Sequence, residues 1–226
     1  ILEDHEQVTF LVRLWCKSHP DSSFIENCAN FLVNKIAEMI STSSSVIGLP
    51  LIVMGLAEVF KDKINDQFEA EIANLDITKI YKMIVEKSLE VLHAKFPEKT
   101  EENLKKRMGL LQTHVYFSIV LVFNEKFADD LGLTYDSKEW PLEEIARCGL
   151  INYDKDGKFN FNHQTYAEFL ISVFIFYLFL TYKNLSKIQL DLIFQVLSDE
   201  KFKIMRIFLN SKLNKVENVQ DLKSFN

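Results

Sequence analysis

The sequence predicts a mainly α-helical protein that carries one small two-stranded β element. Of the 226 residues, 48% are hydrophobic while only six are Gly and four are Pro, so residues that interrupt helices are scarce. There are 19 Phe, and many of them must be buried, which indicates packed helices and not disorder. A chain of this length is long enough for one sizeable core or two small ones.

The first two helices are predicted from their apolar spacing. Apolar residues from Val8 to Trp15 recur at helical intervals, and Pro20 then breaks the pattern. Ser22 or Ser23 is expected to cap the next helix, because serine is a preferred capping residue. The apolar face of this helix runs from Ile25 to Ile36, and the serine-rich stretch "STSSS" after it reads as a loop.

Two further helices complete the first predicted module. Pro50 suits the first turn of a core helix that continues to Phe60. Another helix is predicted from Ile77 to Phe96, with apolar residues on one side and charges on the other. Pro97 stops it, and a charged stretch with a capping threonine starts the next helix, so we place a junction near Lys99. Residues 1–98 are therefore expected to form a helical domain.

The middle of the chain predicts a helix pair, a β hairpin and a long helix. A helix is expected from Asn103 to about Phe127, and its interior "VYFSIVLVF" is apolar on all sides and should be deeply buried. "WPLEEIARCGLI" reads as a short helix begun by Pro141 and ended by Gly149. "LINYDKDGKFNFNH" reads as two strands around a tight Asp-Gly turn. This order is that of a winged-helix domain, which we expect at residues 99–182.

The last segment, residues 183–226, carries helical patterns in "KIQLDLIFQVL" and "FKIMRIFL" and is expected to begin a second helical domain. The most membrane-like stretch, Phe169 to Leu180, has about a dozen residues where a spanning helix needs about 20, so a buried helix is favoured and no membrane contact is expected. No charged region precedes an apolar segment at the start, so no secretion signal is expected. The expected location is therefore the cytoplasm.

Composition argues against nucleic-acid and metal chemistry. The formal net charge is −6 and no run is dense in Lys or Arg, whereas phosphate contacts need clustered positive charge. Cys16, Cys28 and Cys148 are odd in number and widely spaced, which is typical of free thiols. No pair has metal-ligand spacing, so no metal site is expected.

Four segments, "VTFLVRLW", "GLPLIVMGLAEVF", "KIYKMIVEKSLEVL" and "KFNFNHQTYAEFL", follow one another between about Val8 and Tyr182. In this order they resemble the region behind the nucleotide-binding core of NACHT-type STAND NTPases, as in NOD-like receptors and NACHT-ankyrin proteins. The resemblance implies a helical domain, a winged-helix domain and the start of a second helical domain. In that family these parts close over bound ADP and keep the protein inactive. Exchange of ADP for ATP swings the winged helix away and exposes surfaces for homo-oligomerisation.

The resemblance also implies a nucleotide-binding site. Gly48 and Pro50 match the G-x-P motif of the family, which lies against the adenine and ribose. His163 matches the histidine of its h-x-H-x-x-x-x-E-ahh pattern, which reaches the β-phosphate of ADP. A histidine donor at a helix start faces an anion with the helix dipole behind it, so this role is chemically sensible. ADP or ATP would be the cofactor, bound together with the nucleotide-binding core.

The departure from the family is large. A phosphate-cradling GxxxxGK[ST] loop and an acidic strand that binds Mg²⁺ are both missing from the sequence. This chain alone is therefore not expected to be an enzyme, and no catalytic residue is assigned. It would be the regulatory lid and lever of an ATPase in innate immune or stress sensing. Its partners would be the nucleotide-binding core and the repeat domain of the same parent protein.

Each candidate residue also has a plain structural interpretation. Pro50 is compatible with an ordinary helix start, and His163 with a capping or packing histidine. Glu168 reads as a structural carboxylate, because no second acid lies near it for acid–base work. His114, like the other three histidines, reads as a surface or cap residue. Cys148 has no sequence context that would activate it as a nucleophile.

Two other classes of function stay open. A winged-helix DNA binder needs a basic or polar reading helix, whereas "PLEEIARC" offers Glu143 and Glu144 against one Arg147, so this class is less favoured. A self-standing helical scaffold for protein interaction, which would ignore nucleotide, is the other alternative. Size in solution with and without ADP separates the scaffold from the switch.

Overall fold

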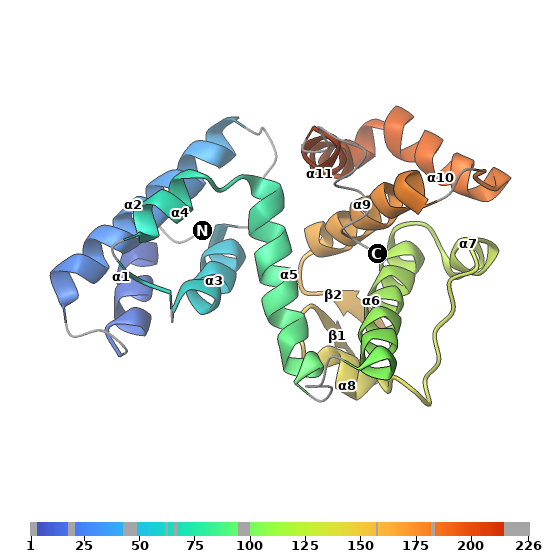
Figure 1. The fold of residues 1–226 in the computed structure, drawn as a ribbon, viewed down its shortest axis with the longest axis horizontal. Helices are drawn as coiled ribbons and strands as arrows, with labels where there is room; N and C mark the ends of the chain where they lie inside the picture. The colour runs from blue at the N-terminus through green and yellow to red at the C-terminus, as the bar shows by residue number, and fades with distance from the viewer. Residues whose placement is uncertain are drawn as a thin grey trace. The chain divides into compact units, whose positions relative to one another are not determined.

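The computed structural model describes residues 4–17, 21–42, 49–61, 63–65, 67–94, 100–156, 158–181 and 184–214. Within these ranges the chain is mainly helical and holds one antiparallel two-stranded sheet, as the composition predicted (Figure 1). It divides into two compact units, Ile1–Lys87 and Ser88–Asn226. The finer division into domains at 1–98, 99–182 and 183–226 stays a prediction.

The first unit is built from helices. They are α1 (Asp4–Trp15), α2 (Ser22–Thr42), α3 (Leu49–Phe60), α4 (Phe68–Ala73) and most of α5 (Ile77–His93). Helix α2 packs against α1 and α4, and α1 packs against α3. At the centre, the indole N–H of Trp15 donates to the Ala57 carbonyl at 2.9 Å. The ring of Phe68 stands edge-on to Trp15 and to Phe60, with centroids 5.7 and 5.3 Å away.

The predicted cap of α2 is wrong by one or two residues. The carboxylate of Asp21 accepts the N–H groups of Ser23 and Phe24 at 3.0 and 3.1 Å, so Asp21 and not Ser22 or Ser23 caps the helix. Aspartate is as good a cap as serine, and here it precedes the first helical residue. These hydrogen bonds, the one from Phe24 first, hold the pKa of Asp21 below its ordinary value.

Helix α3 confirms the helix start predicted at Pro50, which is its second residue. Farther along this helix, a Cβ added at Gly55 would stand 2.8 Å from both Cδ1 and Cγ1 of Ile84 in α5. Such a distance is shorter than van der Waals contact, so α3 approaches α5 this closely because residue 55 has no side chain. The junction expected near Lys99 lies outside the described residues.

The second unit contains the predicted β hairpin, called the wing below, between helices. It comprises the end of α5, then α6 (Glu101–Val122), α7 (Glu125–Asp130), α8 (Leu142–Ala146), β1 (Ile151–Tyr153), β2 (Phe159–Phe161), α9 (Gln164–Thr181), α10 (Lys187–Ser198), a 3₁₀ turn η1 (Glu200–Phe202) and α11 (Lys203–Leu213). Helix α9 packs against both α6 and α11 (Figure 1). Apart from α7, which the sequence did not predict, this is the helix–helix–wing–helix order that was expected.

Helix α6 begins at Glu101, two residues before the predicted Asn103, and ends earlier than predicted. The Thr100 hydroxyl accepts the N–H of Asn103 at 3.2 Å, which confirms the capping threonine. The helix stops at Val122 instead of Phe127, because the side chain of Asn124 accepts the Phe127 N–H at 2.8 Å and starts α7. The interior is buried from Thr113 to Ile119, but its last turn is not.

The two strands of the hairpin are confirmed, while Gly157 of the predicted Asp-Gly turn lies outside the described residues. Strands β1 and β2 pair antiparallel with Ile151 opposite Phe161. The Asp154 carboxylate accepts the N–H groups of Asp156 and Lys158, both at 2.9 Å, and so closes the turn. Gly149 ends the preceding helical turn with φ +75°, a conformation that favours glycine.

Among the described helices, α9 is long and apolar enough to cross a membrane by length and composition. All its side chains from Thr165 to Ser172 are buried within the unit. The burial predicted for this stretch is therefore confirmed in its first half, while Tyr177 and Phe179 nearer its end are 45% and 42% exposed. The absence of membrane contact stays a prediction.

Candidate functional site at the start of helix α9

The residue before His163 ties the wing to the start of α9. The backbone N–H of Asn162 donates to the Leu150 carbonyl at 2.9 Å, and its side-chain amide donates to the Gly149 carbonyl. The amide oxygen of Asn162 accepts the Asn152 side-chain N–H at 2.7 Å. Three hydrogen bonds thus hold the chain against the wing at the point where it enters α9.

His163 caps α9 with its imidazole. Its Nδ1 accepts the backbone N–H of Thr165 at 3.3 Å and lies 2.6 Å from the Thr165 hydroxyl. The His163 carbonyl accepts the N–H of Tyr166 at 3.0 Å, as expected one residue before a helix begins. The ring also stands edge-on to that of Tyr166, with centroids 6.5 Å apart. The capping interpretation of His163 is therefore confirmed.

The cap also decides where the imidazole carries its proton. The Thr165 amide can only donate, so Nδ1 must accept, and in the neutral ring the proton sits on Nε2. Burial lowers the pKa of His163 below its ordinary value of 6.5, so the ring is neutral at pH 7. The half-buried His163 thus presents an Nε2–H donor beside the N-terminus of an 18-residue helix, where the helix dipole favours an anion.

Glu168 lies one turn farther along α9 and is 7% exposed. Its Oε1 accepts the side-chain N–H of Gln164 at 3.1 Å. Burial raises the pKa of Glu168 above its ordinary value of 4.5, while the hydrogen bond from Gln164 lowers it by a smaller amount. Its contacts fit the structural role predicted for this carboxylate.

We expect Glu168→Gln to stabilise the second unit at pH 7 by about 0.5–2 kcal/mol, the usual range for a stabilising substitution. The folded-state pKa is raised, so the contribution of Glu168 to stability is fully present below pH 4.5 and is lost as pH rises through the folded pKa. Glutamine keeps the oxygen that accepts from Gln164 and removes the charge. Urea unfolding at pH 7 and at pH 4 measures the effect, and an equal gain at both pH values would contradict this explanation.

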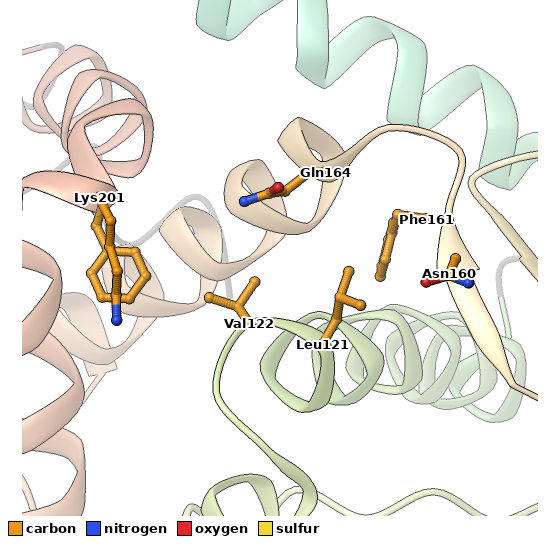
Figure 2. Close-up of a pocket in the computed structure, with 7 residues that line it drawn as sticks. Leu121, Val122, Asn160, Phe161, Gln164 and Lys201 are labelled. Atoms are coloured by element: carbon orange, nitrogen blue, oxygen red, sulfur yellow. The ribbon is translucent and has the colours of Figure 1, made fainter.

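A pocket of about 400 Å³ opens beside this site. It is lined by Leu121 and Val122 of α6, Asn160 and Phe161 of β2, Gln164 of α9, and Lys201 and Phe202 of η1 (Figure 2). The lining consists of four apolar side chains, two amides and one ammonium group. This ammonium, of Lys201, lies 3.2 Å from the Asp199 carboxylate and 4.6 Å from the centre of the Phe202 ring. The sequence did not predict the pocket, because its walls come from four elements.

The other two predicted nucleotide contacts lie elsewhere in the chain. Pro50 is in the first turn of α3, and Gly48 lies outside the described residues. Pro50 belongs to the unit Ile1–Lys87, whereas His163 belongs to Ser88–Asn226. Their joint contact with one nucleotide stays a prediction.

The interpretation of His114 as a surface or cap residue is wrong. Its side chain is fully buried, with Nδ1 2.9 Å from the Leu110 carbonyl and Nε2 3.3 Å from Cys148 Sγ. The carbonyl can only accept, so Nδ1 carries the proton and Nε2 accepts from the thiol. Burial raises the pKa of the Cys148 thiol, which keeps it protonated. Among the described residues no three His, Cys, Asp or Glu side chains form a group that could hold a metal.

Helix α8 directly precedes the hairpin and contains part of the segment "PLEEIARC" that was considered above as a reading helix. It spans only Leu142–Ala146 and carries Glu143 and Glu144 in its first turn. Carboxylates there repel phosphate, which disfavours DNA at this helix, and the absence of a nucleic-acid partner stays a prediction.

Comparisons with protein-family models, with curated proteins and with solved structures find no match to this chain.

Proposed function

We propose that this chain is the regulatory lid and lever of a NACHT-type STAND NTPase, which holds ADP and controls the balance between autoinhibition and homo-oligomerisation in innate immune or stress sensing. The observation that carries the proposal is the state of His163. The residue that matches the phosphate-contacting histidine of that family is neutral, and its Nε2 carries the proton.

The chemistry of this group suits a diphosphate. The terminal phosphate of ADP is anionic and accepts hydrogen bonds, and the N-terminus of α9 adds a favourable dipole. Since Nδ1 is engaged by Thr165, the ring orientation is fixed before a ligand arrives. The site therefore pays little conformational entropy when the nucleotide binds.

The packing of α9 suits a lever. The chain is fastened to the wing through Asn162 on one side of His163, and α9 packs against α6 and α11 on the other. A displacement of His163 away from a phosphate would carry this whole compact unit with it. Rigid-body rotation of a domain is a common form of switching.

The test begins with the sequence of the native transcript upstream of the codon for Ile1. A GxxxxGK[ST] motif and a later acidic strand are expected within roughly 100–200 residues. Failure to find them would remove the nucleotide from the proposal and favour the helical scaffold. Where they are present, the protein that contains them is the one in which His163 is replaced.

His163→Ala and His163→Asn are expected to weaken ADP binding by about 10- to 150-fold, the worth of a hydrogen bond to a charged group. Asparagine is an excellent cap but lacks the Nε2–H donor, so His163→Asn should keep the thermal stability that His163→Ala loses. Isothermal titration with ADP and thermal unfolding measure the two effects. If His163→Asn retains ADP like the native protein, His163 is a cap alone.

A further inference from the structure

A thiol and an imidazole meet inside the second unit. Cys148 follows α8, and His114 lies in the buried interior of α6. The Sγ atom of Cys148 lies 3.3 Å from Nε2 of His114, and the two residues are 5% and 0% exposed. Nδ1 of His114 donates to the Leu110 carbonyl at 2.9 Å, so Nε2 presents its lone pair to the thiol. The proposed function makes no use of this pair.

The thiol of Cys148 is protonated at rest. Burial raises its pKa, while the backbone N–H groups of Leu150 and Ile151, which donate to the sulfur, lower it by smaller amounts. Loss of the proton to solvent would leave a lone buried charge, which is costly. Transfer of the proton to Nε2 of His114 instead keeps the pair neutral overall. This transfer is therefore the less costly way to make the sulfur nucleophilic.

The surroundings of the pair satisfy both charged partners after such a transfer. The imidazolium donates from Nδ1 to the Leu110 carbonyl and from Nε2 to the sulfur, so each of its N–H groups has an acceptor. The thiolate accepts from the imidazolium and from the backbone N–H groups of Leu150 and Ile151. A cysteine within hydrogen-bond reach of a base that a third group orients is the usual arrangement of an activated nucleophile.

We propose that Cys148 is a site of reversible oxidation by hydrogen peroxide, with His114 as the base that accepts the thiol proton. Peroxide is little larger than water, which suits a sulfur that is almost wholly buried. The sulfur attacks one peroxide oxygen as its proton passes to Nε2, the O–O bond breaks, and the leaving hydroxide takes that proton and departs as water. The sum is Cys–SH + H₂O₂ → Cys–SOH + H₂O, in which sulfur is oxidised and peroxide is reduced.

A small thiol such as glutathione reverses the oxidation. One molecule displaces water from the sulfenic acid and forms a mixed disulfide, and a second releases the Cys148 thiol together with the disulfide of the reductant. Nucleotide takes no part in either direction, so this proposal stands or falls separately from the proposed function.

The added oxygen is expected to loosen the attachment of the wing to α9. The carbonyl groups of Gly149 and Leu150, which directly follow Cys148, accept the side-chain and backbone N–H groups of Asn162. Protein interiors hold few voids, so an extra atom beside the buried His114 forces its neighbours to move. The urea transition of the second unit should therefore shift to lower urea after peroxide treatment, and return after glutathione. An unchanged transition in a chain oxidised at Cys148 would overturn this consequence.

Cys28 supplies a matched control within the same chain. It is 1% exposed, and burial first and the Glu69 carboxylate second raise the pKa of its thiol. The reduced chain is kept in peroxide at pH 7 for a series of times, treated with catalase, and unfolded in urea that contains excess dimedone, which marks sulfenic acid. Peptide mass spectrometry gives the rate of oxidation at each cysteine. Iodoacetamide labelling of a separate sample gives the rate at which each thiol becomes exposed by opening.

After division by the labelling rate, Cys148 is expected to be oxidised about 100-fold faster than Cys28, the lower end of what a positioned base contributes. Equal corrected rates at the two thiols would overturn the proposal. This comparison uses the native chain and does not depend on the folding of any variant.

His114→Gln tests the base itself. Glutamine keeps a carbonyl oxygen that can accept from the thiol but cannot take its proton at pH 7. The corrected rate at Cys148 is expected to fall by about 100-fold, while the rate at Cys28 in the other unit stays the same. A corrected rate at Cys148 equal to that of the native chain would overturn the role of His114. Circular dichroism shows whether the variant is folded, and if it is not, the comparison of Cys148 with Cys28 decides alone.

Discussion

Phe208→Ala is expected to lower the free energy of unfolding of the second unit by about 3–5 kcal/mol, the usual effect of removing a buried aromatic ring. The Phe208 side chain in α11 is fully buried, and its ring stands edge-on to that of Phe169 in α9, with centroids 5.3 Å apart. The substitution removes both this ring pair and the packing around it, and leaves a cavity between α9 and α11.

Urea unfolding monitored by circular dichroism measures the effect. Phe194→Ala in the neighbouring helix α10 is the matched control, because that ring is 68% exposed and its removal should change stability by about 0.5 kcal/mol or less. A loss for Phe208→Ala no larger than that of the control would mean that α11 does not contribute to the core of this unit. It would then behave as the separate module that the sequence predicted for residues 183–226.

Trp15→Ala is expected to destabilise the first unit by a similar amount, about 3–5 kcal/mol. Trp15 is fully buried, donates its indole N–H to Ala57, and packs edge-on against Phe68. Trp15→Phe keeps most of the ring volume and removes the donor, so it should lose only about 0.5–3 kcal/mol, which spans a neutral hydrogen bond and an unsatisfied acceptor. If Trp15→Ala and Trp15→Phe lose the same free energy of unfolding, the packing of the ring does not contribute more than its hydrogen bond at this position.

Fluorescence follows the two units separately in the same experiments. Trp140 lies in the second unit and is 5% exposed, so in the Trp15→Phe chain the indole signal reports that unit alone. If the units unfold independently, Trp15→Ala shifts the unfolding transition of the first unit to lower urea. The transition of the second unit, which Trp140 reports, then stays at the same urea concentration. Domains with their own cores often behave in this way.

Much of the fold could be predicted from local patterns. The helices with clear apolar spacing, the Thr100 cap and the hairpin all depend on residues close in sequence. Errors arose where two local signals compete over one or two residues. Asp21 and its neighbouring serines are all good caps, and Asn124 begins a new helix inside a run that is otherwise apolar. Helix α4 is six residues long and gives too short a pattern to recognise.

The candidate site was predictable in part. The position of His163 before a helix follows from the sequence, but the location of its proton depends on the contact between Nδ1 and Thr165, which needs coordinates. The pocket needs elements far apart in the chain. The burial of His114 could have been found, because helical spacing places it on the same face as Leu110, Phe117 and Ser118 within an apolar helix.

The three cysteines allow the opening of each unit to be followed by chemical labelling. Cys28 in the first unit and Cys148 in the second are both buried, and burial raises the pKa of each thiol. Because only an exposed thiolate reacts with an alkylating reagent, each thiol is shielded until its own unit opens. Cys16 is partly exposed and would be labelled first. The labelling rates of Cys28 and Cys148 thus report the opening of the first and the second unit separately, and the thiol that is modified sooner lies in the unit that opens more often.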